Sequence, residues 1–297
     1  MPCIFTIDVE DWFHVLDIPG SPSIDTWSSL ESRVERNFLK LLDLADEHHT
    51  NTTCFFLGWI AERFPHLVRE AVGRGHEIAS HGYAHRLVYE LSQAEFRADA
   101  QRARMILEDA AGCRVLGFRA PGFSVTKDTP WFFEELANSG YRYDSSIFPA
   151  RRGHGGFEEA ARDPFVVHTA PGGSVVEFPI TVVGDVYPLC LFGGGYLRLF
   201  PWRLIRSMAR RCLRRDRTVV FYVHPREVDV DHPRMRMNGW RRFKSYVNLE
   251  TTQHKIAQVL KTFRCGSFRN TFAEMVTGSS ITESVRAAAV GANGARL

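Results

Sequence analysis

The sequence predicts an α/β barrel-like domain, and two features of the chain support this prediction. Short apolar, β-rich runs alternate with stretches of helical periodicity along much of the 297 residues. This alternation is typical of parallel strands joined by crossover helices. In addition, polar residues follow directly after several of these runs, and in such a barrel catalytic groups lie where the strands end.

The first half of the chain contains the most regular alternation. Short apolar runs are expected to form strands over 3–9, 53–57, 76–80, 115–119 and 141–145. Periodic stretches between them are expected to form helices over 30–48, 61–74, 93–111 and 129–139. The helix over 93–111 has the clearest ends, because Ser92 can cap its start and Gly112 can stop it.

The second half interrupts this alternation twice. Residues 151–173 form an insertion that contains Gly, Arg and Pro, and residues 226–249 are expected to form a long covering loop. That loop includes the run 234–247, which is aromatic and basic without clear periodicity. Elsewhere the alternation resumes, with strands expected over 175–180 and 218–223 and helices over 202–214 and 252–263.

Length alone suggests about two domains, but α/β barrels often extend over ~200–250 residues as one unit. We therefore expect one barrel domain over 1–277. Residues 278–297 are rich in small side chains and are expected to form a disordered tail.

Composition excludes several classes of protein. The chain is 44% hydrophobic and 24% charged, and its net charge of +3 is too small to indicate a nucleic-acid partner. Its six cysteines are scattered without a Cys-x-x-Cys pair, which argues against a disulfide framework and a thiolate zinc site. No stretch approaches the ~20 apolar residues of a membrane span. Because the N-terminus also has no secretory leader, we expect a cytoplasmic protein.

The strongest functional signal is the histidine pair His81 and His85, which follows the strand expected over 76–80. On a helical turn, side chains four residues apart lie on one face and can share a metal ion. The alternative is two solvent-exposed imidazoles in a loop. The position after a strand, together with an acidic cluster at the end of another strand, favours a metal site.

That acidic cluster consists of Asp8, Glu10 and Asp11. Carboxylates this close repel one another, and a bound cation relieves the repulsion. Asp8 and Glu10 project to one side of a strand and Asp11 to the other, so we assign Glu10 as the metal ligand and Asp8 as a general base. An acidic helix cap leading into a turn is the alternative for this stretch.

Two histidines and one carboxylate suit a divalent ion such as zinc, with cobalt, nickel or manganese as alternatives. Such a set leaves room for water, which predicts a hydrolytic site.

Three further residues are candidates for catalysis. Arg119 ends a strand before a Pro-Gly turn, and its guanidinium would keep Asp8 ionised and oriented. His224 follows the strand expected over 218–223 and can serve as a general acid. Asp144 could orient His224. Each also has an ordinary explanation, as a surface ion pair, a structural histidine and an Asp-Ser-Ser turn respectively.

In this order, these residues resemble the motifs of the polysaccharide deacetylase superfamily, also called carbohydrate esterase family four. The likeness is strongest to exopolysaccharide-locus deacetylases associated with exosortase systems. The stretches that carry it are 8–13, 77–89, 143–149, 193–196 and 221–225. The resemblance implies a distorted (β/α) barrel with fewer than eight repeats, and a divalent metal held by one acid and two histidines.

The acidic motif departs from the common family pattern. Many members have adjacent aspartates followed by glycine, whereas this chain has Asp-Val-Glu-Asp at 8–11. This difference leaves open whether Glu10 or Asp11 is the carboxylate ligand.

The sequence thus predicts metal-dependent hydrolysis of an N-acetyl group on a sugar of a bacterial exopolysaccharide or its precursor. The expected partner is an N-acetylated oligo- or polysaccharide, and a loose association with a polysaccharide-synthesis complex stays open. Two alternatives remain. One is another hydrolase of C–N bonds, acting on a cyclic amide or ureide, and the other is a non-catalytic saccharide-binding protein.

Overall fold

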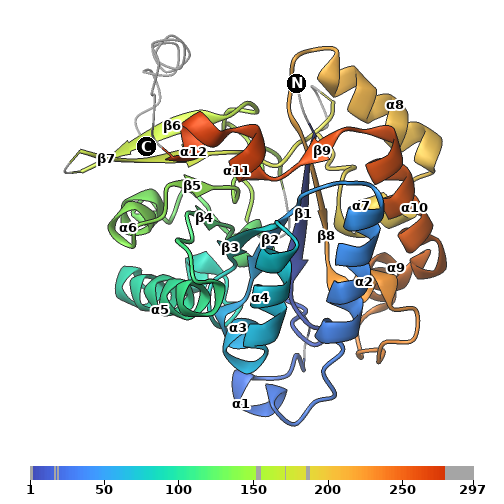
Figure 1. The fold of residues 1–297 in the computed structure, drawn as a ribbon, viewed down its shortest axis with the longest axis horizontal. Coiled ribbons are helices and arrows are strands. Elements are labelled where there is room, and N and C mark those ends of the chain that lie inside the picture. The colour runs from blue at the N-terminus through green and yellow to red at the C-terminus, as the bar shows by residue number, and fades with distance from the viewer. Residues whose placement is uncertain are drawn as a thin grey trace.

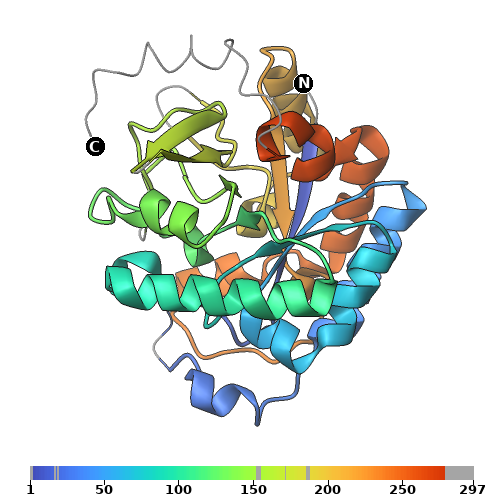
Figure 2. The same ribbon diagram turned by 60° about the vertical axis from the view of Figure 1, so that its left-hand side comes forward.

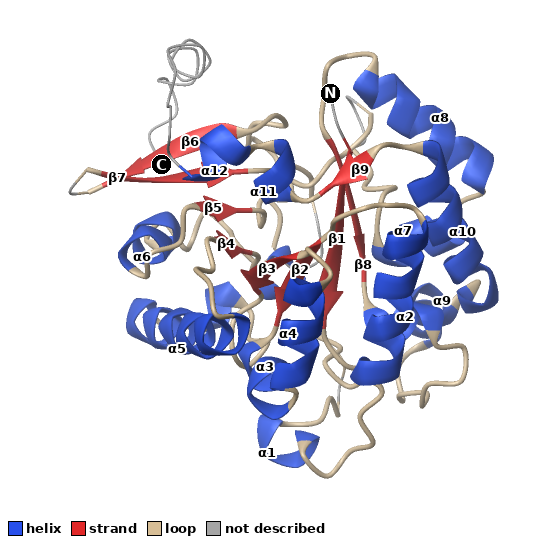
Figure 3. Cartoon of the chain, in the orientation of Figure 1, coloured by secondary structure: helices blue, strands red, loops and turns tan. Residues whose placement is uncertain are grey.

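A computed structural model of the chain describes residues 3–16, 18, 20–151, 155–170, 172–184 and 188–277. Its centre is a curled sheet with the strand order β6-β7-β5-β4-β3-β2-β1-β8, and helices surround this sheet (Figure 1, Figure 3). The strands are β1 (Cys3–Val9), β2 (Thr53–Phe56), β3 (Glu77–Ser80), β4 (Gly117–Phe118), β5 (Tyr143–Asp144), β6 (Phe165–Thr169), β7 (Gly173–Glu177), β8 (Val219–Val223) and β9 (Cys265–Gly266). All the pairings are parallel except the antiparallel pair of β6 and β7.

The helices pack mainly on the outside of the curled sheet. They are α1 (Ile24–Trp27), α2 (Val34–Glu47), α3 (Gly58–Arg63), α4 (Pro65–Gly73), α5 (Gln93–Ala111), α6 (Phe132–Asn138), α7 (Gly194–Leu199), α8 (Trp202–Leu213), α9 (Gly239–Tyr246), α10 (Leu249–Thr262), α11 (Phe268–Thr271) and α12 (Ala273–Thr277). Short 3₁₀ turns occur at η1 (Val88–Glu90), η2 (Pro121–Phe123) and η3 (Pro225–Val228). Figure 2 shows α5 lying across the sheet beside α3, α4 and α6.

Strand alternation separates two apolar cores. On β1, every second side chain packs into the core between sheet and helices, namely Cys3, Phe5, Ile7 and Val9. Ile4 packs instead into a second core inside the curled sheet. Since successive side chains point to opposite faces, Thr6 and Asp8 share the inner side with Ile4.

The same alternation directs other polar residues inward. Phe118 on β4 packs outward, which turns Arg119 inward. Val220 and Tyr222 on β8 pack inside, and His224 continues that side. Because parallel strands end at the same edge, these side chains meet at one mouth of the barrel.

The two edge strands of the sheet, β6 and β8, are not joined by a hydrogen-bonded ladder. Single hydrogen bonds from β8 to the segment after β7 close the barrel instead. The amide of Val220 donates to Thr181 Oγ1 at 2.9 Å, and the amide of Tyr222 donates to the carbonyl of Phe192 at 3.1 Å. The segment between β7 and α7 therefore fills the gap beside β8. The predicted distorted α/β barrel is confirmed.

Helix α5 matches its predicted limits. The Ser92 hydroxyl accepts from the amide of Glu95, whose carboxylate accepts from the amide of Ser92, and Gly112 ends the helix with a φ of 64°. This capping box pairs amides that a helix start otherwise leaves unsatisfied.

Several predicted boundaries were wrong. The single helix expected over 61–74 is two helices, α3 and α4, because Pro65 interrupts the turn. The strand expected over 141–145 is only two residues long, and the insertion 151–173 contains β6. The covering loop 226–249 contains helix α9. The tail 278–297 lies outside the described residues.

Candidate active site

A cavity of about 410 Å³ opens where β1, β3 and β8 end, and it is bordered by α7 and α9. Its lining includes Asp8, Glu10, His81, His85 and His224. The residues that the sequence singled out after three separate strands thus share one cavity.

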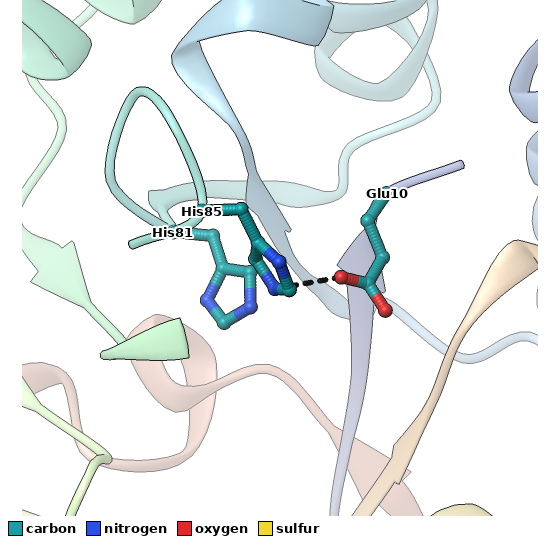
Figure 4. A group of neighbouring side chains, drawn as sticks. All are labelled: Glu10, His81 and His85. Carbon is teal, nitrogen blue, oxygen red and sulfur yellow. Dashed lines mark ion pairs between the residues drawn. The ribbon is translucent and has the colours of Figure 1, made fainter. Parts of the chain in front are cut away.

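Glu10, His81 and His85 form the group best suited to hold a metal. One ligand atom from each lies within 4.8 Å of the others, and all three side chains are buried. Figure 4 shows Glu10 at the end of β1 with its carboxylate directed at His85, and Oε2 lies 2.7 Å from His85 Nε2. His85 and His224 lower the pKa of Glu10 against the opposing effect of burial, so the carboxylate is ionised.

His81 is oriented for coordination. Its Nδ1 donates to the carbonyl of Arg119 at 2.7 Å, so its Nε2 carries the lone pair. Burial lowers the pKa of His81 to about 3, which keeps the imidazole neutral. A neutral imidazole held through its other nitrogen is the usual form of a metal-binding histidine. The two imidazoles and the carboxylate therefore fit a divalent ion.

A tight loop brings the histidines together, and the helical turn that we expected is absent. Gly82 has a φ of 74° and His85 one of 51°, which reverse the chain over five residues. Asp99 on α5 holds this loop, because its carboxylate accepts from the amides of Tyr83 at 2.7 Å and Ala84 at 3.2 Å. Sequence reasoning missed Asp99, which lies in an ordinary helical pattern.

Asp11 has a different environment from Glu10. Its carboxylate accepts from the Ser32 hydroxyl at 2.6 Å and from the amides of Arg33 and Val34 at 3.0 and 3.3 Å, at the start of α2. The chain turns after β1, where the amide of Glu10 donates to the carbonyl of Asp8. Asp11 therefore caps a helix, and Glu10 is the carboxylate that faces the histidines.

Asp8 and Arg119 form a buried ion pair beside this group. Arg119 Nη1 lies 2.7 Å from Asp8 Oδ1 and also donates to Thr6 Oγ1 at 2.7 Å. The guanidinium further donates to the Ser145 carbonyl and stacks over the Phe55 ring at 4.1 Å. These contacts fix the arginine, so Asp8 is held in one orientation with Oδ2 directed away from Arg119.

His224 faces the same carboxylates from β8. Its Nε2 lies 3.8 Å from Asp8 Oδ2 and 3.5 Å from Glu10 Oε1. Burial lowers the pKa of His224 to about 4, although Glu10 and Asp8 oppose that shift. The imidazole is therefore neutral at neutral pH.

The predicted contact between Asp144 and His224 is absent from the described part of the chain. Tyr143 packs inside the barrel and Ser145 contacts Arg119, so strand alternation turns Asp144 to the other face. There its carboxylate accepts from the amide and hydroxyl of Ser146 at 3.1 and 2.6 Å. The side chain beside His224 Nδ1 is instead Glu227, at 3.7 Å.

His14 is a cavity residue that the sequence did not indicate. Its Nδ1 accepts from the amide of Asp11 at 2.9 Å, which leaves a proton on Nε2. That nitrogen is buried and has no hydrogen-bond partner in the described residues. Burial lowers the pKa of His14, so the ring is a neutral donor at the cavity wall.

The fold and site together define an α/β-barrel protein with a buried carboxylate–histidine cluster of hydrolase type. A family model described as "Polysaccharide deacetylase" matches residues 25–143, and a "Domain of unknown function (DUF3473)" matches residues 145–273. Residues 25–143 therefore carry a polysaccharide deacetylase domain, of the kind also called carbohydrate esterase family four. The two matches meet after β5, so the single domain over 1–277 stays a prediction.

Individual relatives agree with the match over residues 25–143. A peptidoglycan-N-acetylglucosamine deacetylase of Bacillus cereus is 31% identical over 97 residues, which are 32% of this chain and 35% of that protein. Alignments with curated relatives cover 31% to 47% of their length, so this chain spans about a third to a half of them.

Solved structures show the same fold. A protein assigned as a polysaccharide deacetylase from Mycobacterium smegmatis superimposes with a TM-score of 0.62 at 22% identity, covering 95% of this chain and 91% of that one. An allantoinase has a TM-score of 0.59 at 16% identity, covering 89% and 86%. Among the described residues, no helix is long and apolar enough to cross a membrane.

Proposed function

We propose that this protein is a metal-dependent N-deacetylase that releases acetate from an N-acetylated sugar unit. The observation that carries the proposal is the buried group Glu10, His81 and His85, with Asp8 and His224 facing it across one cavity. The match of residues 25–143 to the polysaccharide deacetylase model supports it.

Glu10, His81 and His85 would hold the divalent ion, for which zinc is our first expectation. When bound, that ion would polarise the acetamide carbonyl and lower the pKa of a water molecule. Arg119 fixes Asp8 through the contact at Oδ1, which leaves Oδ2 to accept the proton of the attacking water.

His224 would then donate a proton to the departing amine. Because its pKa of about 4 leaves it neutral at the start, that proton has to arrive during the reaction. Asp8 Oδ2 lies 3.8 Å from His224 Nε2, so a proton accepted by Asp8 has a short path to the imidazole. Such acid–base groups typically contribute ~10²–10⁴-fold to the rate.

The finer parts of the proposal rest on the sequence resemblance alone. We propose a bacterial exopolysaccharide or its precursor as the substrate, and a loose association with a polysaccharide-synthesis complex. The motifs shared with exopolysaccharide-locus deacetylases support them.

Metal content of the purified protein is the first test. We expect about one divalent ion per chain in the wild type, and its loss in His81→Ala and His85→Ala. His254→Ala is the matched control, because His254 lies on the exposed side of α10, where its Nε2 pairs with Gln258. Equal metal in all four proteins would contradict the site.

The substrate class is tested by identifying the product that the enzyme releases. Acetate release from an N-acetylglucosamine tetramer, lost in Asp8→Asn, supports deacetylation. Hydrolysis of allantoin without acetate release from any acetylated saccharide would instead support the ureide alternative.

A further inference from the structure

The cavity wall beyond the metal group is strongly basic. Besides Asp8 and Glu10, the charged residues among its described lining are all cations, namely Arg198, Arg226, Arg241 and Lys244. They come from α7, η3 and α9, on the side of the cavity next to His224. The two acids already have partners, because Asp8 pairs with Arg119 and Glu10 with His85.

Two of these cationic side chains already form hydrogen bonds or ion pairs within the protein. Arg198 is buried, contacts Glu227, and donates to the carbonyls of Lys244 at 2.9 Å and Ser245 at 3.2 Å. Arg241 donates to the carbonyl of Leu16. Arg198 and Arg241 therefore have structural roles in the cavity wall. The cations that can bind a ligand are Arg226 and Lys244.

Arg226 is partly buried, and its guanidinium lacks the partners that such a group normally has. No hydrogen bond or ion pair of its side chain occurs within the described residues, and its Nε is buried without a partner. Burial lowers the pKa of Arg226, and this effect outweighs the opposing effects of Glu10 and Tyr246. A partly buried charge without an ion-pair or hydrogen-bond partner is costly, which argues that an anion completes this part of the cavity.

Aromatic side chains border the same basic wall. Trp240 on α9 is 67% exposed and Tyr196 on α7 is 38% exposed, and both line the cavity. Lys244 Nζ lies 5.6 Å from the centre of the Trp240 ring. An exposed flat ring beside a cation suits the apolar face of a sugar that also carries a negative charge.

We propose that this cavity binds an acidic saccharide, in which an anionic group next to the N-acetylated unit pairs with Arg226 and Lys244. The proposal rests on the proposed function only in assigning the acetamide to the metal group. The anion is a sugar carboxylate or a phosphate linked to the sugar, and both would accept charge-assisted hydrogen bonds from the guanidinium.

Binding without turnover tests this proposal. Zinc-loaded Asp8→Asn protein is titrated by calorimetry with a tetrasaccharide of alternating glucuronate and N-acetylglucosamine, with UDP-N-acetylglucosamine, and with a neutral N-acetylglucosamine tetramer. We expect one of the two anionic ligands to bind at least about tenfold more tightly than the neutral tetramer, with a preference that weakens as salt rises. Whichever anionic ligand binds more tightly identifies the carboxylate or the phosphate as the group.

Substitutions of Arg226 test whether the anionic group binds at this residue. Arg226→Gln in the same background should reduce the ratio of anionic to neutral affinity by about tenfold, while Arg226→Lys should retain most of it. Arg210→Gln is the control, since Arg210 is exposed on α8 and outside the cavity lining. An equal affinity for all three ligands, or an anionic preference that survives Arg226→Gln, would overturn the proposal. Tight binding of the acidic ligand, together with a wild-type protein that releases no acetate from any of the three ligands, would contradict deacetylation and leave the anion subsite standing.

Discussion

Glu10 and Asp11 are adjacent acids with separate tasks in the structure. Glu10 faces His85 across the metal group, whereas Asp11 accepts from the amides that begin α2. The sequence left open which of them is the metal ligand. Their surroundings therefore predict that one substitution affects metal binding and the other affects stability.

We expect Glu10→Gln to lose bound metal, because a neutral amide is a weaker ligand than a carboxylate. Asp11→Asn should keep the metal and lose about 1–2 kcal/mol of unfolding free energy, since buried amides at a helix start lose a charged acceptor. Metal analysis and urea denaturation of both variants measure the two effects. Loss of metal in Asp11→Asn alone would reverse the assignment.

Gly117 is required by close packing inside the barrel. A Cβ at this position would lie 2.1 Å from the ring of Tyr143, which is fully buried and donates to Glu77. We expect Gly117→Ala to cost about 1–3 kcal/mol of unfolding free energy through overpacking. Gly73→Ala is the control, because nothing lies within 4 Å of its added Cβ. Urea denaturation measures both, and equal stability of the two variants would contradict this account.

The sequence predicted which residues reach the cavity where both the alternation along a strand and the end of that strand could be recognised. Asp8 lies near the end of the apolar run 3–9, His81 and His224 directly follow expected strands, and all three reach the cavity as expected. Asp144 failed because β5 has only two residues, so its parity could not be read from the sequence. Arg226 and His14 gave no signal, since their importance comes from missing hydrogen-bond partners rather than from spacing.

The loop between His81 and His85 is the element on which the metal group depends. Two amides inside it are held by Asp99 from α5, and His85 itself has a positive φ. A left-handed backbone is unfavourable for a non-glycine residue, so the surrounding contacts have to maintain it. The position of the second histidine is thus set from a neighbouring helix.

We therefore expect Asp99→Ala to weaken metal affinity by about 10–100-fold, as loss of an outer hydrogen-bond partner typically does. Asp99→Asn should retain part of the affinity through its remaining acceptor oxygen. Asp109→Ala is the matched control on the exposed side of the same helix. Zinc affinity measured by competition with a chelator tests all three variants. Unchanged affinity in Asp99→Ala would show that the loop keeps its conformation without Asp99.

Helices and strands were predicted correctly where capping residues and hydrophobic periodicity agree. They were predicted less well where tertiary packing determines the secondary structure. Helix α5 has a capping box and a terminal glycine, and both of its ends were correct. Helix α9 was missed because its exposed surface carries aromatic and basic side chains in place of an apolar stripe. Strand β6 was missed because it is only partly buried, whereas β7 overlaps the strand expected over 175–180.

At the scale of the whole molecule, Asp144 and Glu177 join two strands of the barrel. They are register partners on β5 and β7, and both are fully buried. Burial raises the pKa of Asp144 to about 6, and burial together with the Asp144 charge raises the pKa of Glu177 further. The folded protein therefore keeps a proton on this pair where the unfolded chain has released it, since carboxyl groups in unfolded chains titrate near pH 4.

This difference determines the sign of a pH effect on stability. Above about pH 4 the folded state binds more protons than the unfolded state, so the pair's contribution to stability falls as pH rises through the raised pKa values. Glu177→Gln keeps a neutral side chain at every pH and removes much of that loss. We expect the unfolding free energy of Glu177→Gln, relative to wild type, to increase steadily between pH 5 and pH 8.

The comparison between variant and wild type isolates the carboxyl pair from other titrations. Buried histidines such as His76 and His232 have lowered pKa values, so they make stability rise with pH, but they are identical in both proteins. Urea denaturation of metal-free protein at each pH gives the difference, with Glu250→Gln on the exposed surface of α10 as the control. A difference that stays constant with pH would mean that Glu177 is ionised in the folded barrel, and that the β5–β7 contact is held by a charge instead of a shared proton.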